Sequence, residues 1–238
     1  MNVLSIGNSF SQDAQRYIHR LAKKDGFEMR TANLYIGGCP LRTHYLNVLD
    51  DEKAYVFEFN GEGTGLFVSI KEALKSNEWD VITLQQASRF SVDFSTFTPY
   101  IEELVSYVRK YAPKAKIYIH QTWAYEKESA RLESVGIDTP EEMLKSIVQS
   151  YNKASKLIKA DGIIKCGEAM LELSKIVGKV HRDALHASLG AGRYLLALTW
   201  YKTLTGRDIS NNDFNDFDEP VSPEQRQAVI EVVNKIVK

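Results

Sequence analysis

A serine near the start of this 238-residue sequence has the surroundings of a nucleophile. Ser9 follows an apolar run, residues 3–6, and the pair Gly7-Asn8, which predicts a first strand ending in a tight turn. Open α/β sheets bind their ligands at the carboxyl ends of strands, so Ser9 lies where a substrate would bind. A serine there is a nucleophile if a base reaches it. The alternative is a helix cap, because Ser and Asn are common cap residues.

A base for this serine is found late in the chain, in the segment of residues 181–188. Asp183 and His186 are three residues apart, a spacing that brings a carboxylate beside an imidazole on one turn. An aspartate that accepts from one ring nitrogen leaves the other nitrogen able to take a proton. Two alternatives stay open: a capping Asp beside a packed His, and a metal site made of His181, Asp183 and His186.

Two glutamines follow a buried strand expected over residues 79–84. Buried amides must find hydrogen-bond partners, so Gln85 and Gln86 indicate a polar cleft. A structural amide that ties two loops together is the alternative for Gln85. Trp123 and Tyr125 follow the next strand, and they either line a carbohydrate-binding rim or pack in the core.

The elements that must position these residues alternate between strand and helix. Strands are expected over residues 3–6, 28–35, 79–84, 116–120 and 162–165, and helices over residues 13–24, 69–76, 98–112, 139–160, 168–177, 191–204 and from 222 onward. A hairpin over residues 55–68 is interpreted as an excursion. No repeat or linker interrupts residues 1–238. The sequence predicts one α/β domain, a three-layer α/β/α sandwich with a mainly parallel sheet of about five strands.

Composition excludes several classes of function. The formal net charge is -1 and no basic stripe appears, so we expect no nucleic-acid partner. No apolar segment has the length of a membrane span, and the N-terminus lacks the pattern of a signal peptide, which favours a cytoplasmic protein without a membrane partner. Cys39 and Cys166 belong to no Cys-x-x-Cys motif, so redox or zinc chemistry is not expected. Nothing indicates an oligomeric state.

Taken in order, these motifs resemble those of the SGNH (GDSL-like) hydrolase superfamily. They are Gly-Asn-Ser-Phe at residues 7–10, a loop glycine, a polar amide after a strand, and Asp-x-x-His at residues 183–186. The sequence more closely resembles a bacterial branch with Leu-Gln-x-x-Ser, here residues 84–88, and Gln-Thr-Trp-Ala-Tyr, here residues 121–125. The similarity spans residues 3–200 and implies a flavodoxin-like SGNH fold.

The resemblance also implies a role for each motif. Ser9 would be the nucleophile, His186 the general base and later the acid, and Asp183 the residue that orients His186. The backbone N–H groups of Ser9 and Gly38 would donate to the oxyanion. The family's third donor, an asparagine amide, is absent here, and we expect Gln85 in its place.

Gln86 remains the alternative donor, because neighbouring side chains on an extended backbone point to opposite sides. We also list Gln86, Trp123 and Tyr125 as substrate-binding candidates. The resemblance implies a serine esterase that removes small acyl groups, O-acetyl above all, from a carbohydrate through an acyl-enzyme, with no metal or organic cofactor. Its partner would be a small-molecule ester, an acylated sugar. The alternatives are a non-catalytic carbohydrate-binding relative and a metal-dependent hydrolase that uses His181, Asp183 and His186.

Overall fold

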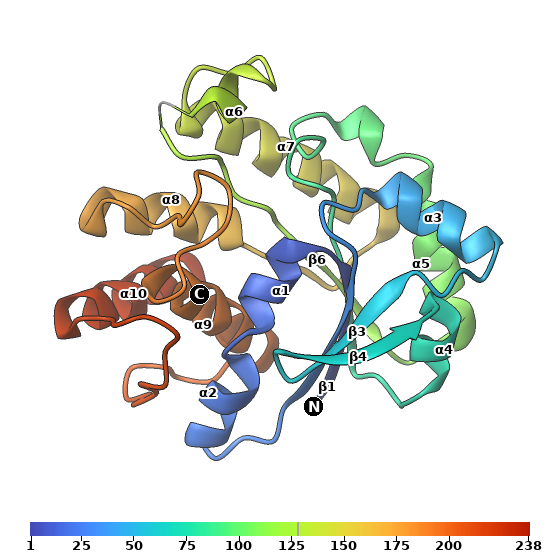
Figure 1. Cartoon of the computed structure of the whole chain (residues 1–238), viewed down its shortest axis with the longest axis horizontal. Coiled ribbons are helices and arrows are strands. Elements are labelled where there is room, and N and C mark those ends of the chain that lie inside the picture. Colours follow the sequence, from blue (N-terminus) through green and yellow to red (C-terminus); the bar gives the residue numbers. More distant parts are fainter. Residues whose placement is uncertain (128) are drawn as a thin grey trace.

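The computed structural model describes residues 1–127 and 129–238 as a central sheet between two layers of helices (Figure 1). The described strands lie in the order β4-β3-β2-β1-β5-β6-β7. Five of them are parallel: β1 (Asn2–Gly7), β2 (Arg30–Tyr35), β5 (Val81–Leu84), β6 (Lys116–His120) and β7 (Gly162–Ile164). The predicted α/β class and mainly parallel sheet are confirmed.

The described part of the sheet has seven strands, so the prediction of about five was wrong. The two additional strands are β3 (Tyr55–Phe59) and β4 (Glu62–Val68), which form the hairpin predicted as an excursion. β3 pairs antiparallel with β2, and β4 pairs antiparallel with β3. The edge of β2 would otherwise leave a row of backbone N–H and C=O groups unpaired, and the hairpin satisfies them.

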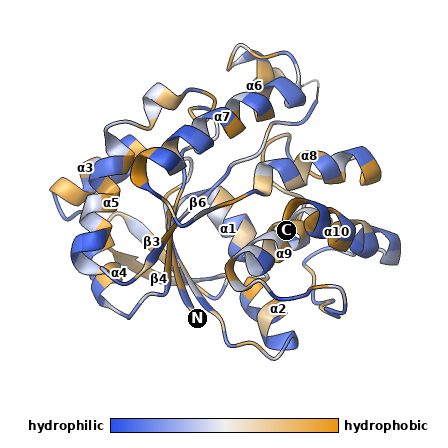
Figure 2. Ribbon diagram, turned by 180° about the vertical axis from the view of Figure 1, so that it is seen from behind, coloured by the Kyte–Doolittle hydropathy of each residue, from blue (hydrophilic) through white to orange (hydrophobic). Residues whose placement is uncertain are grey.

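The helices cover both faces of the sheet, each with its own hydrophobic cluster. One face packs against α1 (Ser9–Gln15), α2 (Ile18–Lys24), α8 (Cys166–Val177), α9 (Ala191–Thr205) and α10 (Pro223–Ile236). The other packs against α3 (Leu41–Leu49), α4 (Ile70–Lys75), α5 (Tyr100–Tyr111) and α7 (Pro140–Ile158). Helices such as α7 and α10 carry both hydrophilic and hydrophobic residues (Figure 2), as expected for helices with one buried face.

Local sequence explains where several helices begin. Ser69, Thr139 and Ser222 each accept a backbone N–H of the helix that follows, and so cap α4, α7 and α10. The helix expected over residues 13–24 is instead two helices, α1 and α2, which meet at Arg16 and Tyr17. The short helices α6 (Ala130–Glu133) and η1 (Phe94–Thr96) lie in loops. None of the described helices is long and apolar enough to cross a membrane.

The parallel strands bring the predicted motifs to one edge of the sheet. In the register of the sheet, Gly7 at the end of β1 lies opposite Tyr35 of β2, and Ile6 lies opposite Leu84 at the end of β5. The loops after these three strands carry the serine, the glycine pair and the two glutamines. They open on the same side, as parallel strands require.

Candidate active site

Ser9 is the first residue of α1, and the residue before it caps the helix. The Asn8 side-chain oxygen accepts a backbone N–H of α1 at 3.0 Å, and its amide donates to the Cys39 carbonyl at 3.1 Å. Gly7 allows this tight turn, because a Cβ there would lie 2.2 Å from Ser11 Oγ. Asn8 therefore takes the capping role that was the alternative for Ser9, and the Ser9 hydroxyl is available for other contacts.

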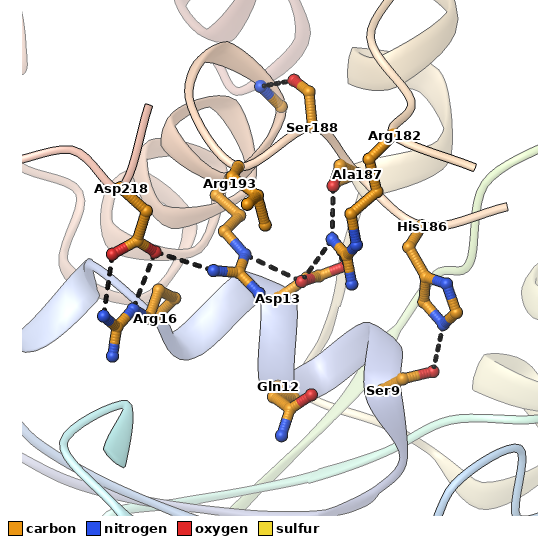
Figure 3. A network of polar contacts seen from close by, with 12 residues as sticks. Ser9, Gln12, Asp13, Arg16, Arg182, His186, Ala187, Ser188, Arg193 and Asp218 are labelled. Carbon is orange, nitrogen blue, oxygen red and sulfur yellow. Dashed lines mark hydrogen bonds and ion pairs between the residues drawn. The ribbon is translucent and has the colours of Figure 1, made fainter. Parts of the chain in front are cut away.

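The structure brings Ser9, His186 and Asp183 into one hydrogen-bonded series. His186 Nε2 lies 2.9 Å from Ser9 Oγ, as drawn in Figure 3, and His186 Nδ1 lies 2.8 Å from Asp183 Oδ2. An ionised carboxylate can only accept, so Nδ1 carries the proton and donates to Asp183. Nε2 is then the acceptor for the Ser9 hydroxyl, which is the arrangement of a nucleophile beside its base.

The carboxylate of Asp183 is held in its ionised form by the turn that contains it. Partial burial alone would raise its pKa, but hydrogen bonds from the His186 backbone, the His186 ring and the Leu185 backbone lower that pKa to about 2. The backbone N–H groups of His186 and Leu185 donate to Oδ1 at 2.7 and 3.2 Å. Asp183 therefore stays charged beside the imidazole at any ordinary pH.

The loop that carries His186 is a tight turn fixed at several points. The Arg182 N–H donates to the His186 carbonyl at 3.0 Å, which closes the turn. Ala184 lies at its tip with φ of 62°, a left-handed conformation that is unusual for a residue with a side chain. The Glu126 N–H donates to the Ala184 carbonyl at 2.9 Å and holds this tip against the loop after β6.

Trp123 packs beneath the surface against the same loop, so the prediction that it binds substrate at the rim of the site was wrong. Its side chain is fully buried, and its ring stacks on Phe10 with centroids 3.7 Å apart and planes at 5°. The indole Nε1 donates to the Leu185 carbonyl at 2.8 Å. Trp123 lies too deep for a ligand, and it links α1 to the residue beside His186.

A buried carboxylate on α1 joins the two halves of the site, and sequence analysis did not predict it. Asp13 has no exposed surface and lies one turn after Ser9. Its oxygens accept from Arg182 Nη1 at 2.9 Å and from Arg193 Nε at 2.8 Å (Figure 3). Arg193 also pairs with Asp218 at 2.7 Å. Asp13 thereby connects the serine helix to the histidine loop and to α9.

Gln85 does not line the site as predicted. Its side chain is 2% exposed, and its Nε2 donates to Asn8 Oδ1 at 2.5 Å. Its Oε1 lies 2.7 Å from His120 Nδ1. Gln85 is therefore the structural amide that was its alternative role. It orients the residue that caps α1, because its amide donates to the Asn8 side-chain oxygen.

Gln86 is also occupied by internal contacts, and neither of its predicted roles fits. Its Oε1 accepts from the backbone N–H of Leu41 at 3.0 Å and of Ala87 at 2.9 Å. Its Nε2 donates to the Thr96 carbonyl at 2.9 Å. The amide ties the start of α3 to the loop after β5, and it is only 1% exposed.

A cleft of about 560 Å³ opens beside Ser9, a size typical of small-molecule sites. Its lining includes Gly38, which has φ of 62°, together with Ser88 and Tyr125. The Ser88 and Tyr125 hydroxyls are 3.0 Å apart, and the substrate-binding role of Tyr125 stays a prediction. Within the described residues, the backbone N–H groups of Ser9 and Gly38 have no protein acceptor.

The structure does not assemble the metal site considered as an alternative. His181 is largely buried, and its Nε2 lies 3.1 Å from the Ala124 carbonyl, away from the Asp183–His186 pair. Among residues 1–127 and 129–238, no three His, Cys, Asp or Glu side chains are grouped to hold a metal ion. Both cysteines are free and buried, and burial raises the pKa of Cys39 to about 12, so its thiol is unreactive.

The chain matches one protein family along most of its length. The sequence pattern of a family described as a domain of unknown function (DUF4886) matches residues 2–230. A crystal structure of a DUF4886 family protein from Bacteroides uniformis is 32% identical, with a TM-score of 0.93 over 100% of this chain and 94% of that one. No curated protein matches significantly.

More distant structures share the fold. One is described as an SGNH hydrolase from Slackia heliotrinireducens, 22% identical, with a TM-score of 0.59 over 86% of this chain and 98% of that one. Another is a carbohydrate esterase of family 3 from Talaromyces cellulolyticus, 9% identical, with a TM-score of 0.54 over 87% and 97%. The SGNH resemblance that the motifs indicate is confirmed at the level of the fold.

Proposed function

We propose that this chain, which belongs to the DUF4886 family, is a serine esterase that hydrolyses small acyl esters through an acyl-enzyme. The observation that carries the proposal is the series of short contacts from Ser9 Oγ to His186 Nε2 and from His186 Nδ1 to Asp183 Oδ2. The cleft beside Ser9 supplies room for a substrate.

Acylation begins when His186 Nε2 takes the Ser9 hydroxyl proton as Ser9 Oγ attacks the ester carbonyl carbon. The carbonyl electrons move to the oxygen and form a tetrahedral intermediate. Its collapse breaks the bond to the alcohol oxygen, which receives the proton from His186. Asp183 keeps the imidazole ring in the productive tautomer and stabilises the imidazolium between the two steps.

Deacylation repeats this chemistry with water. His186 removes a proton from a water molecule that attacks the acyl carbonyl, and the Ser9 oxygen leaves with that proton. The products are the carboxylic acid and the free enzyme. No metal or organic cofactor takes part in either step.

The developing oxyanion needs hydrogen-bond donors, and the backbone supplies two. The N–H groups of Ser9 and Gly38 border the cleft and have no acceptor among the described residues. Losing one oxyanion donor typically costs about 10²–10³-fold in rate. The third donor expected from the Gln85 amide is not part of this proposal, because that amide is engaged with Asn8.

We propose an O-acetyl group on a small carbohydrate as the substrate. Support comes from the shared fold with a carbohydrate esterase and from a cleft bordered by the Ser88 and Tyr125 hydroxyls, which can bond to sugar hydroxyls. A carbohydrate-binding relative without activity would share this cleft. It would bind acetylated sugars without turnover and would be indifferent to a Ser9→Ala substitution.

Hydrolysis of p-nitrophenyl esters of increasing acyl length tests the proposal, together with labelling by a fluorophosphonate probe. We expect the acetyl ester to be the best substrate and Ser9→Ala to lose at least about 10³-fold in kcat, along with labelling. The matched control is Ser106→Ala, which changes an exposed serine on α5. A folded wild type that neither turns over nor labels would contradict the esterase.

A further inference from the structure

The charged side chains that line the cleft at Ser9 are both positive. They are Arg89, in the loop after β5, and Arg131, in α6. Among residues 1–127 and 129–238, the lining contains no aspartate or glutamate. The chain as a whole has more acidic than basic residues, 31 against 30, so this sign is a property of the cleft rather than of the composition.

Neither arginine has an acidic partner among the described residues. In the part of the chain that the structure describes, Arg89 and Arg131 form no ion pair, whereas Arg16, Arg20, Arg182, Arg193 and Arg207 all do. The Arg89 guanidinium lies over the Phe90 ring at 4.6 Å, and Phe90 lines the same cleft. The guanidinium groups thus keep their donors available to a ligand.

Both charges act on one point of the cleft. Burial raises the pKa of Tyr125, while the hydrogen bond with Ser88 and the charges of Arg131 and Arg89 oppose that rise. The two arginines come from separate segments but both bring positive charge to the Tyr125 hydroxyl. A negatively charged group bound near that hydroxyl would be attracted by both positive charges.

We propose that the substrate is an ester whose alcohol part carries a carboxylate, and that Arg89 and Arg131 bind this carboxylate. The inference rests on the proposed function, because a small acyl group at Ser9 leaves the rest of the cleft to the alcohol part. Guanidinium groups suit this role, since their planar fork of donors matches the two oxygens of a carboxylate. The substrate class is therefore acylated acids, such as acetylated sugar acids, rather than neutral acetylated sugars.

The test compares two acetyl esters that differ in charge, 4-acetoxybenzoate and 4-acetoxybenzamide. The ratio of their kcat/KM values is measured for wild type, Arg89→Gln, Arg131→Gln and the double variant. Exposed charge pairs support about two- to fivefold effects each, so we expect the double variant to lower the ratio about tenfold. The wild-type ratio should also fall in 1 M salt, where the screening length is about 3 Å.

Arg30→Gln is the matched control, because it removes an exposed arginine from the start of β2, at the opposite edge of the sheet. It should leave the ratio unchanged. A ratio that is the same in wild type and the double variant would overturn the inference, while Ser9-dependent hydrolysis of both esters would still support the esterase.

If the protein hydrolyses neither ester, binding measurements still test the anion site independently of the esterase activity. The affinity of 4-hydroxybenzoate and 4-hydroxybenzamide for the same variants is then measured by ligand-observed NMR. Arginine-dependent preference for the carboxylate would support the anion site and leave the esterase refuted. Equal binding of the two compounds by wild type would refute the anion site as well.

Discussion

Replacing Asp13 with asparagine tests whether the buried ion pairs hold the site together. The substitution keeps the size of the side chain and removes its charge. Asp13 has no exposed surface, while the side chains of its partners Arg182 and Arg193 are 27% and 13% exposed. The variant would leave two guanidinium groups close to a neutral amide, with only Arg193 retaining another carboxylate, Asp218.

The size of the effect follows from this burial. Removing one partner of a buried pair costs about 3–5 kcal/mol, and partial exposure of the arginines reduces the expected loss to about 2–4 kcal/mol. For a chain of this length each kcal/mol lowers Tm by about 2–4 °C, so we expect Tm to fall by roughly 4–16 °C. Urea unfolding followed by circular dichroism gives the free energy directly.

The same variant should also lose activity while still folded. Asp13 links the helix of Ser9 to Arg182, the neighbour of Asp183, so the loss should fall mainly on kcat rather than on KM. Asp216→Asn is the matched control, because it breaks an exposed pair with Arg20 that contributes about 0–1 kcal/mol. Equal stability of the Asp13 and Asp216 variants would refute the structural role of the buried pair.

Two further predictions concern Asp183, which orients the base, and Gly7, which lies in the turn before the nucleophile. Asp183→Asn should lower kcat by about 10²–10⁴-fold, measured with p-nitrophenyl acetate, because the ring loses the acceptor that fixes its tautomer. The pKa of Asp183 is about 2 in the folded chain, below its ordinary 3.8, so its contribution to stability is present above pH 4. That contribution is lost as the pH falls from about 4 to 2. The difference in unfolding free energy between wild type and Asp183→Asn should therefore shrink over this interval. A difference that does not change with pH would contradict the ionised state of Asp183. Gly7→Ala should destabilise the chain and reduce kcat, because the new Cβ would meet Ser11 Oγ at 2.2 Å and displace the turn before Ser9; unchanged thermal unfolding and kcat would refute that steric argument.

The fold was predictable because its signals are local. Apolar runs, capping residues such as Ser69 and Thr139, and alternation of strand with helix identified the parallel core of the sheet. The place of the hairpin was not predictable, because pairing with β2 depends on which edge of the sheet is free. Helix α3 is absent from the helices expected from the sequence, and it begins directly after Pro40, with no side-chain cap to mark its start.

The site was predictable where chemistry requires particular residue types at short spacing. The sequence identified Ser9, Asp183 and His186, and the structure brings the three together. It assigned Gln85 and Trp123 wrongly, because strand ends do not reveal whether a side chain turns into the cleft or into the core.

One signal for the buried network was present in the sequence. Asp13 lies at helical spacing from Phe10 and Tyr17, so it is a carboxylate on an otherwise apolar face of the chain. Such a residue needs a partner if it is buried. The identity of that partner, Arg182, was not predictable, because the two residues are 169 positions apart.

The most direct test of the central claim is to trap the acyl-enzyme. Wild type is mixed with p-nitrophenyl acetate, quenched in acid within the first turnover, digested and mapped by mass spectrometry. The account predicts a burst of p-nitrophenol and an acetyl group on Ser9, with neither in Ser9→Ala. Turnover with no acetyl group on Ser9, or with equal turnover by Ser9→Ala, would contradict it.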